Sequence, residues 1–240
     1  MIITKEKLRQ DEREKWQKRF IQRPGLLAEK LRQQPFYKKV SALYTTPSAL
    51  FSQIRINALL DGKAVCGPSP GLKKGFYLVR PYQVPYGKIP YAVTLKGMET
   101  HGETLTTGDQ AAGLEIGLMV VDCLALDRNG CIVGDGNGFV DLAAAIFSAW
   151  GKLAADPMIV TVAPQESIVE EDLAAEPWDC FADLLLTERD VLAFDPREKR
   201  KGWPLYWDYL PERRIRKITP LWKLYCLLRR NTGSRPHNSA

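Results

Sequence analysis

The chain has 240 residues, of which 45% are hydrophobic and 26% charged, and its formal net charge is +6. This composition is ordinary for a soluble globular protein, and the length suits one large α/β domain with small appendages. No run approaches the apolar length of a membrane span, and the amino-terminal segment MIITKEKLRQDEREKW is too charged for a secretory signal, so we expect a cytoplasmic protein that does not contact membranes.

Helices and strands are predicted to alternate along residues 4–79. The apolar spacing indicates a helix over 4–22, ended by the segment Arg23 to Gly25, with Trp16 and Phe20 as core anchors. The next predicted elements are a helix over 26–33, a strand over 39–44, a helix over 48–60 and strands over 64–67 and 76–79.

The segment 80–116 is less regular, because it is rich in Pro, Tyr, Gly and Thr. We interpret it as either a hairpin-bearing insertion or a substrate-facing loop, with a strand at 92–95. The two histidines of the chain, His101 and His237, lie in polar stretches. Both are expected to be solvated residues rather than catalysts.

The stretch 117–141 is the most informative part of the chain. It predicts a buried strand over 117–121, a turn over 127–130, a short strand over 131–133, a glycine-rich loop and a helix over 139–150. Gly134, Gly136 and Gly138 would let successive amide groups point into one concavity, a nest that binds anions. A plain glycine turn is the alternative, since a lone GxGxG run is a weak motif. Asp141 would either cap the helix or hold Mg²⁺ beside a nucleotide.

Strands over 158–164 and 182–188 complete the pattern. Strands that alternate with helices predict an α/β fold with a mainly parallel, doubly wound sheet flanked by helices, Rossmann-like, with the site at the carboxyl ends of the strands. We expect residues 1–195 to form this domain and residues 196–240 to be an extension packed on it. The extension carries an aromatic cluster (Trp203, Tyr206, Trp207 and Tyr209) and ends in a mobile tail over 231–240.

The glycine-rich stretch resembles the signature of the 5-formyltetrahydrofolate cyclo-ligase (methenyltetrahydrofolate synthetase) family. That signature is an apolar strand, a Leu-Ala-Phe-Asp turn and a Gly-Tyr-Gly-x-Gly-Tyr-Tyr-Asp loop. The matching positions are Leu124, Ala125, Asp127, Gly130, Gly134, Gly136, Gly138 and Asp141. Further blocks resemble the family in order: Lys5, Leu8 and Arg9; residues 40–47; Gly62 and Lys63; and residues 178–188. The segment SPGLKKGFYLV resembles the divergent cyclo-ligase-like branch in particular.

The chain also departs from the family pattern. Ile132 stands where the family usually has an arginine, Trp178 replaces a histidine, and Ser48 falls where a folate-contacting glutamate is expected. Asp135 and Val140 replace tyrosines, and Asp135 adds like charge near an anion. These replacements predict weaker nucleotide binding.

The resemblance implies an ATP-dependent cyclisation of 5-formyltetrahydrofolate to 5,10-methenyltetrahydrofolate, with release of ADP and phosphate, in one-carbon metabolism. It implies that Lys5 and Arg9 contact the ATP phosphates, that the loop Gly134, Asp135, Gly136, Asn137, Gly138 and Phe139 cradles them, and that Asp141 serves Mg²⁺. The tyrosines of PYQVPYGKIPY would stack on the pterin ring or pin a loop to the body. No catalytic residue is assigned. The alternative is a divergent paralogue that binds nucleotide or folate as a regulatory or interaction protein.

The remaining composition indicates which partners to expect. The five cysteines have no CxxC pair, so we interpret them as reduced and mostly buried. The basic residues are scattered between elements without a recognisable nucleic-acid-binding module, so we expect a small reduced folate as substrate and no nucleic acid. The protein is expected to be a monomer or a homodimer.

Overall fold

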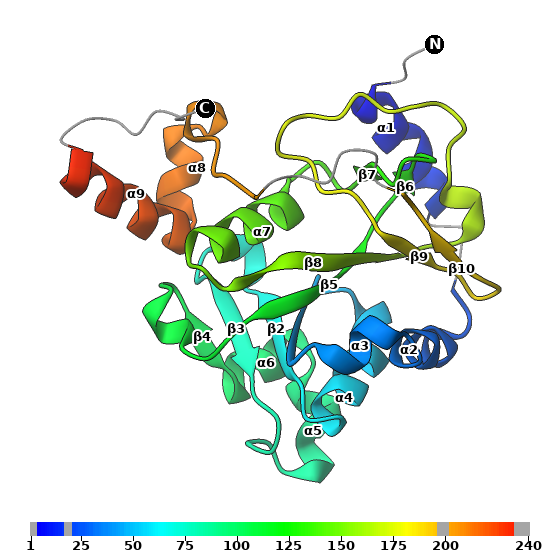
Figure 1. Cartoon of the computed structure of the whole chain (residues 1–240), viewed down its shortest axis with the longest axis horizontal. Coiled ribbons are helices and arrows are strands. Elements are labelled where there is room, and N and C mark those ends of the chain that lie inside the picture. The colour runs from blue at the N-terminus through cyan, green and yellow to red at the C-terminus, as the bar shows by residue number, and fades with distance from the viewer. Residues whose placement is uncertain (1–3, 17–20, 196–201, 233–240) are drawn as a thin grey trace.

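A central β-sheet organises the molecule (Figure 1). The structure is a computed structural model that describes residues 4–16, 21–195 and 202–232, without the side chains of 11–16, 231 and 232. Among these residues the sheet has eight strands in the order β10-β9-β8-β5-β1-β2-β3-β4. The run from β9 to β2 is parallel, and β10, β3 and β4 add antiparallel edges. The predicted α/β fold with a mainly parallel sheet is confirmed.

The strands of this sheet are β1 (Ala42–Thr45), β2 (Ala64–Pro68), β3 (Phe76–Val79), β4 (Glu103–Leu105), β5 (Ile116–Asp122), β8 (Leu153–Val162), β9 (Leu184–Leu186) and β10 (Val191–Ala193). Two short strands, β6 (Ala125–Leu126) and β7 (Ile132–Val133), form a separate antiparallel pair. The helices are α1 (Lys5–Trp16), α2 (Pro24–Arg32), α3 (Pro35–Lys39), α4 (Ser52–Leu60), α5 (Ile89–Ala92), α6 (Leu95–His101), α7 (Phe139–Ala149), α8 (Glu212–Lys217) and α9 (Thr219–Thr232).

Helices cover both faces of the sheet (Figure 1). On one face, residues such as Leu43 and Val65 pack with α2, α4, α5 and α6. On the other, residues such as Tyr44 and Met119 pack with α7, α8 and α9. Successive strand residues point to opposite faces, and here both faces are dry. The inner strands therefore consist of continuous apolar runs, and this pattern made them predictable from the sequence.

The strand predicted at 92–95 is wrong, because helices α5 and α6 occupy this segment. Pro90 lies in the first turn of α5, and the hydroxyl of Thr94 caps α6 by accepting a hydrogen bond from the Gly97 amide at 3.0 Å. These helix start signals favour helices in this segment, although its short apolar run had indicated a strand. Region 80–116 does carry the pairing of a hairpin, since β4 runs antiparallel to β3 with the two helices between them.

The short strand at 131–133 was expected to continue the main sheet, but β7 pairs with β6 instead. Asp127 causes this reversal. Its Oδ1 accepts the amides of Asn129 and Cys131 at 2.9 and 2.8 Å, and its Oδ2 accepts the amide of Leu173 at 3.0 Å. The turn therefore folds β7 back on β6 above the sheet edge.

The described part of the proposed extension shares the main core. Ile215, Ile218 and Leu221 are buried against α7 and the sheet, and Trp207 is 6% exposed beside Tyr225 at a ring distance of 5.6 Å. Other expectations fall outside the description, namely the contacts of Trp16 and Phe20, His237, and residues 233–240 of the expected tail. No helix among the described residues is long and apolar enough to span a membrane.

Candidate functional site

A cavity of about 450 Å³ lies at the carboxyl ends of β1, β2 and β5. Strand β1 has β2 on one side and β5 on the other, so the chain order reverses here, and doubly wound sheets bind ligands at such a crevice. The ends of three strands and the segments after them contribute Tyr44, Thr46 and Pro47 (β1), residues 68–72 (β2) and residues 122–124 (β5). The loop before α7 and its first turn contribute residues 134–136 and 138–141. The other lining residues are Arg9, Leu95, Ile132, Asp179 and Cys180. The expected position of the site is therefore matched by a cavity.

The glycine loop forms one wall of this cavity. Gly136 and Gly138 have φ angles of 91° and 60°, a region that favours glycine. Gly138 precedes α7 without a side-chain cap, and the amides of Gly136, Gly138 and Phe139 donate to no residue that the structure describes. The Asn137 amide differs, because it donates to Asp135 Oδ1 at 2.8 Å. Most of the nest is thus available to an anion.

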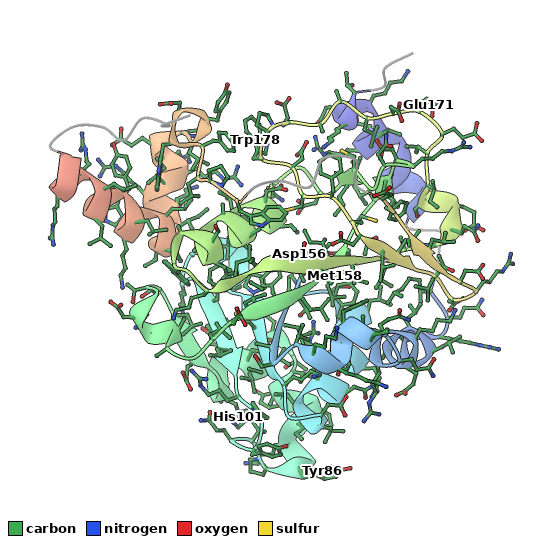
Figure 2. The ribbon with its side chains drawn as sticks, in the orientation of Figure 1. Tyr86, His101, Asp156, Met158, Glu171 and Trp178 are labelled. Atoms are coloured by element: carbon green, nitrogen blue, oxygen red, sulfur yellow. The ribbon has the colours of Figure 1, made fainter. Side chains whose placement is uncertain are left out.

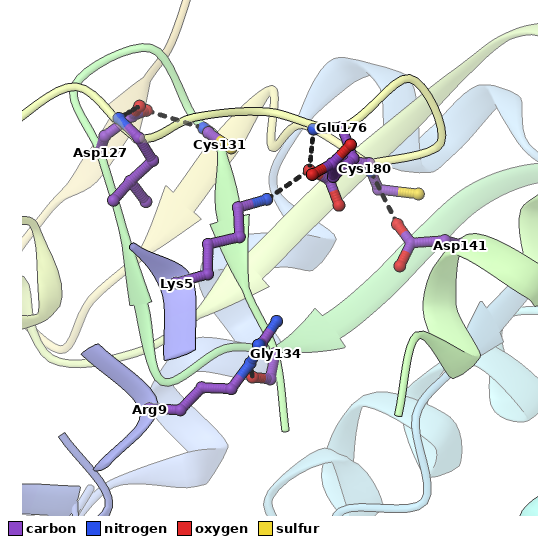
Figure 3. Close-up of polar contacts among 10 residues, drawn as sticks. Lys5, Arg9, Asp127, Cys131, Gly134, Asp141, Glu176 and Cys180 are labelled. Atoms are coloured by element: carbon purple, nitrogen blue, oxygen red, sulfur yellow. Dashed lines mark hydrogen bonds and ion pairs between the residues drawn. The ribbon is translucent and has the colours of Figure 1, made fainter. Parts of the chain in front are cut away.

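The two predicted cations take different positions (Figure 3). Arg9 lines the cavity, and its Nε donates to the carbonyl oxygen of Gly134 at 3.2 Å. Lys5 lies behind it, with Nζ 2.5 Å from Asp179 Oδ2, and is not among the lining residues. Burial alone would lower the pKa of Lys5, but the hydrogen bond and charge of Asp179 outweigh it and raise that pKa. Lys5 is therefore separated from the cavity by Asp179, and its contact with ATP phosphates stays a prediction.

Asp141 connects the first turn of α7 to the segment before β9. Its Oδ1 accepts the Cys180 amide at 2.8 Å (Figure 3), and it does not cap its own helix. Among the described residues no group of three or more His, Cys, Asp or Glu side chains could hold a metal. Mg²⁺ often binds through one or two carboxylates together with substrate phosphates. Asp141 beside the glycine loop fits that arrangement, with ligands shared between protein and nucleotide.

Arg214 of α8 is a site residue that sequence reasoning missed. Its Nη2 donates to the carbonyl oxygen of Asn137, and its guanidinium lies 5.8 Å from the ring centre of Phe139. Burial lowers the pKa of Arg214, and the charges of Asp141 and Asp135 oppose that effect. The basic cluster around it was visible in the sequence, but nothing local linked it to a loop 77 residues away.

Tyr44 is a second residue that was missed. It is fully buried, it lines the cavity, and its hydroxyl has no hydrogen-bond partner among the described residues. Its ring makes edge contacts with Phe76 and Phe147 at 6.2 and 5.9 Å. Burial, together with the nearby Cys66 and Asp122, raises the pKa of Tyr44 well above its ordinary value, so the hydroxyl stays protonated. A buried donor of this kind can orient a polar ligand.

The family model for 5-formyltetrahydrofolate cyclo-ligases matches residues 4–188, most of the chain. The chain belongs to the 5-formyltetrahydrofolate cyclo-ligase family. The family is one of ligases, and membership supports an enzyme of that class. The match ends before α8 and α9, so Arg214 lies outside it.

Individual relatives of this cyclo-ligase chain are distant. A methenyltetrahydrofolate synthase domain-containing protein of Danio rerio is 22% identical over 202 residues, which are 82% of this chain and 52% of that protein. The chain thus spans about half the length of this relative. The solution structure of Aquifex aeolicus 5,10-methenyltetrahydrofolate synthetase is 19% identical, with a TM-score of 0.51 over 82% of this chain and 95% of that one. A Mycoplasma pneumoniae 5,10-methenyltetrahydrofolate synthetase has a TM-score of 0.48, 12% identity, and coverage of 76% and 98%.

The structure locates the residues at which the chain departs from the cyclo-ligase sequence pattern. Ile132 puts an apolar side chain in the cavity wall. Ser48 is outside the lining: its hydroxyl accepts the Leu50 amide at 3.3 Å, and its carbonyl accepts Arg55 Nη2 at 3.0 Å. The exposed tyrosines Tyr82 and Tyr86 do not line this cavity, and whether they stack on the pterin ring stays a prediction.

His101 lies in neither a loop nor the cavity lining. It ends α6, half-buried, with its ring 5.8 Å from that of Tyr91. The expectation that it is not a catalyst stays a prediction. Figure 2 places it with Tyr86 at the lower end of the molecule, away from Trp178.

Proposed function

We propose that this cyclo-ligase family member catalyses the ATP-dependent cyclisation of 5-formyltetrahydrofolate to 5,10-methenyltetrahydrofolate, with release of ADP and phosphate. The observation that carries the proposal is the glycine loop whose Gly136, Gly138 and Phe139 amides line the cavity at the strand ends without a described partner. Such amides at a helix amino terminus bind phosphate through hydrogen bonds and the helix dipole. Family membership supplies the reaction class.

The proposed reaction makes modest demands on side-chain chemistry. The formyl oxygen attacks the terminal phosphorus of ATP and ADP leaves. The neighbouring folate N–H nitrogen then attacks the activated carbon, and phosphate departs with that oxygen and takes up the proton that the nitrogen loses. Bound Mg²⁺ would neutralise phosphate charge, with Asp141 as its protein ligand. Arg9 and the loop amides would hold the phosphates in line with the formyl oxygen. Phosphoryl transfer depends mainly on this positioning and charge stabilisation.

Tyr44 would serve the folate side of the cavity. Tyr44 lines the cavity while its hydroxyl is closed to solvent; in this proposal the bound folate reaches that hydroxyl, which donates to a carbonyl or ring nitrogen of the substrate. Thr46 and Asp122, joined by a hydrogen bond of 2.5 Å, form the adjacent wall. As proposed, the protein is a cytoplasmic enzyme of one-carbon metabolism that uses ATP, Mg²⁺ and a reduced folate.

A second candidate function is nucleotide or folate binding without catalysis, in a regulatory or interaction role. The positions of Ile132 and Ser48 favour it, because the cavity wall lacks the family arginine and the expected glutamate position is occupied by a capping serine. The two functions differ in whether the cyclised product forms.

The test is an absorbance assay for methenyltetrahydrofolate with purified protein, ATP, Mg²⁺ and 5-formyltetrahydrofolate. Asp141→Asn keeps an oxygen that can accept the Cys180 amide but loses the charge, so it is expected to fold normally and lose most activity. Asp141→Ala removes both roles and is expected to lose stability as well. Calorimetry decides the alternative: binding of ATP without binding or turnover of 5-formyltetrahydrofolate would exclude the cyclo-ligase reaction.

A further inference from the structure

A second, smaller cavity of about 140 Å³ adjoins the glycine loop. Gly138 and Asp141 line both cavities, so the two spaces meet at the amino terminus of α7. The remaining walls are Leu142 and Ala145 of α7, Trp178, and residues 203–206, 209, 210 and 214 of the extension. The extension therefore contributes most of a cavity that begins where the phosphate nest ends.

The walls of this cavity are aromatic and partly open. The ring of Trp178 lies 4.8 Å from that of Tyr209 and 5.9 Å from that of Tyr206. Tyr209 is 64% exposed, although Trp207, two residues earlier, is 6% exposed and packs in the core. A cluster with only a packing role would bury Tyr209 in the same way. The aromatic surface instead faces a cavity.

Arg214 gives this apolar cavity a polar corner. It lines the cavity while its Nη2 bonds to the carbonyl oxygen of Asn137 in the glycine loop. A guanidinium carries five donors, so further N–H groups are available beyond that bond. Aromatic walls with a few directed polar groups are typical of sites for flat heterocycles, and guanidinium groups recognise ring nitrogen and oxygen acceptors of purines.

We propose that this cavity binds the purine base of the nucleotide whose phosphates lie on the glycine loop. The inference rests on the proposed function and adds the part of the site that the extension builds. Trp178 and Tyr209 would stack against the base, and Arg214 would donate to it or to the adjoining phosphate. The larger cavity at the strand ends is then left to the reduced folate.

The shared border favours a base over a separate ligand. A ligand confined to the small cavity would not need Gly138 or Asp141, whereas a nucleotide must pass from an aromatic pocket to an anion nest. Trp178 also favours a nucleotide that spans both cavities. It lies within the residues that match the family, and its ring packs against Tyr206 and Tyr209 of the extension. The pocket thus combines one residue of the family domain with residues beyond it.

The experiment compares ATP with inorganic tripolyphosphate, each with Mg²⁺, by calorimetry on the full chain. Tyr209→Ala is expected to weaken ATP binding roughly tenfold, within the range that base stacking on an aromatic ring contributes, and to leave tripolyphosphate binding unchanged. Tyr209→Phe keeps a ring and should bind ATP as the natural chain does. The matched control is Tyr86→Ala, since Tyr86 is 79% exposed and lines neither cavity.

Three results would overturn the inference: unchanged ATP affinity in Tyr209→Ala, an equal loss for tripolyphosphate, or a natural chain that binds ATP no more tightly than tripolyphosphate. The cyclisation assay separates this from the proposed function. If the natural chain forms product while Tyr209→Ala binds ATP normally, the base pocket fails alone. If a base-dependent difference is present but no product forms, the reaction fails alone.

Discussion

Tyr44→Phe is expected to stabilise the protein and weaken its function at the same time. The substitution removes one hydroxyl and keeps the ring, whose edge contacts with Phe76 and Phe147 at 6.2 and 5.9 Å should persist. The hydroxyl is buried and has no partner among the described residues. It therefore costs desolvation free energy that the folded chain does not recover through a protein hydrogen bond.

The size of the effect follows from that cost. An unsatisfied buried polar group costs about 1–3 kcal/mol, so Tyr44→Phe should raise the free energy of unfolding by about 1 kcal/mol. In a chain of this length such a change raises the melting temperature by about 2–4 °C. Tyr44 lines the cavity although its hydroxyl is closed to solvent. If the bound folate reaches that hydroxyl, as proposed, its loss should weaken 5-formyltetrahydrofolate binding by about 1 kcal/mol, which is roughly fivefold.

Thermal unfolding and calorimetric titration together test this expectation. Tyr37→Phe is the matched control, because Tyr37 is also buried but donates to Asp61 Oδ2 at 3.0 Å and does not line the cavity. That control should lower the melting temperature and leave folate affinity unchanged. A lower melting temperature for Tyr44→Phe would show that its hydroxyl has a strong partner in the folded chain, and unchanged folate affinity would remove it from the binding site.

Four further outcomes are expected. Gly136→Ala should weaken Mg·ATP binding about tenfold, because a φ of 91° strains an alanine and its Cβ would lie 3.3 Å from Arg9 Nε. Gly134→Ala is the control, since a Cβ there meets nothing within 4 Å, and its Mg·ATP affinity should stay within about twofold of that of the natural chain. Equal effects of the two substitutions in a titration would refute the anion nest. Lys5→Ala should weaken ATP binding and lower the melting temperature, since it leaves the largely buried Asp179 without its cation, whereas the exposed Lys7→Ala should change neither; unchanged ATP affinity would remove Lys5 from the site. A maleimide at pH 7.5 should label the half-buried Cys226 quickly and Cys131 only on unfolding, because burial raises the pKa of Cys131 to about 11; mass spectrometry that finds Cys131 labelled in the native protein would contradict this. Chelation of Mg²⁺ should abolish ATP binding in the natural chain, because Asp122, Asp135, Asp141 and Asp179 line the cavity and would repel an uncomplexed triphosphate; tight binding in excess EDTA would refute the role given to Asp141.

The sequence was sufficient to predict elements whose environment is uniform. Strands β2, β3 and β5 lie within one residue of the predicted ranges, and β1 begins three residues later than predicted. These strands were visible because they are dry on both faces and their apolar runs are unbroken. Segment 92–95 shows the limit of that signal. Only Ala92 and Val93 are buried, so short an apolar run fits a helix equally well, and Pro90 together with the capping by Thr94 decides for helix. Strand β10 and helix α3 are too short to leave a periodic pattern.

The site could be predicted only where its residues are local. The glycine loop and Asp141 lie within a few positions of each other, so their spacing carries the signal. Tyr44 reaches the larger cavity from β1, and Arg214 reaches the glycine loop and the smaller cavity from α8; the packing of both elements around α7 brings them there. A single sequence does not show which residues of distant elements come close together in the fold. The sequence shows that position 132 is an isoleucine and not the family arginine, but it does not show which cation lies near the loop in the fold.

The charges around the glycine loop explain why Arg214, a residue of the extension, is held beside that loop. Four carboxylates and one guanidinium, that of Arg9, line the larger cavity, and Ile132 contributes no charge. Asp179 pairs with Lys5 and Asp122 bonds to Thr46, while Asp135 accepts the Asn137 amide and Asp141 accepts the Cys180 amide. Asp135 and Asp141 flank the loop itself, and both stabilise the charged form of Arg214 although its burial opposes it. In a low-dielectric setting a cation is held where it faces opposite charge, so the two acids that would otherwise repel a phosphate also fix Arg214 beside the nest. Arg214 thereby places a positive charge beside the glycine loop from a segment beyond residue 188, where the family match ends.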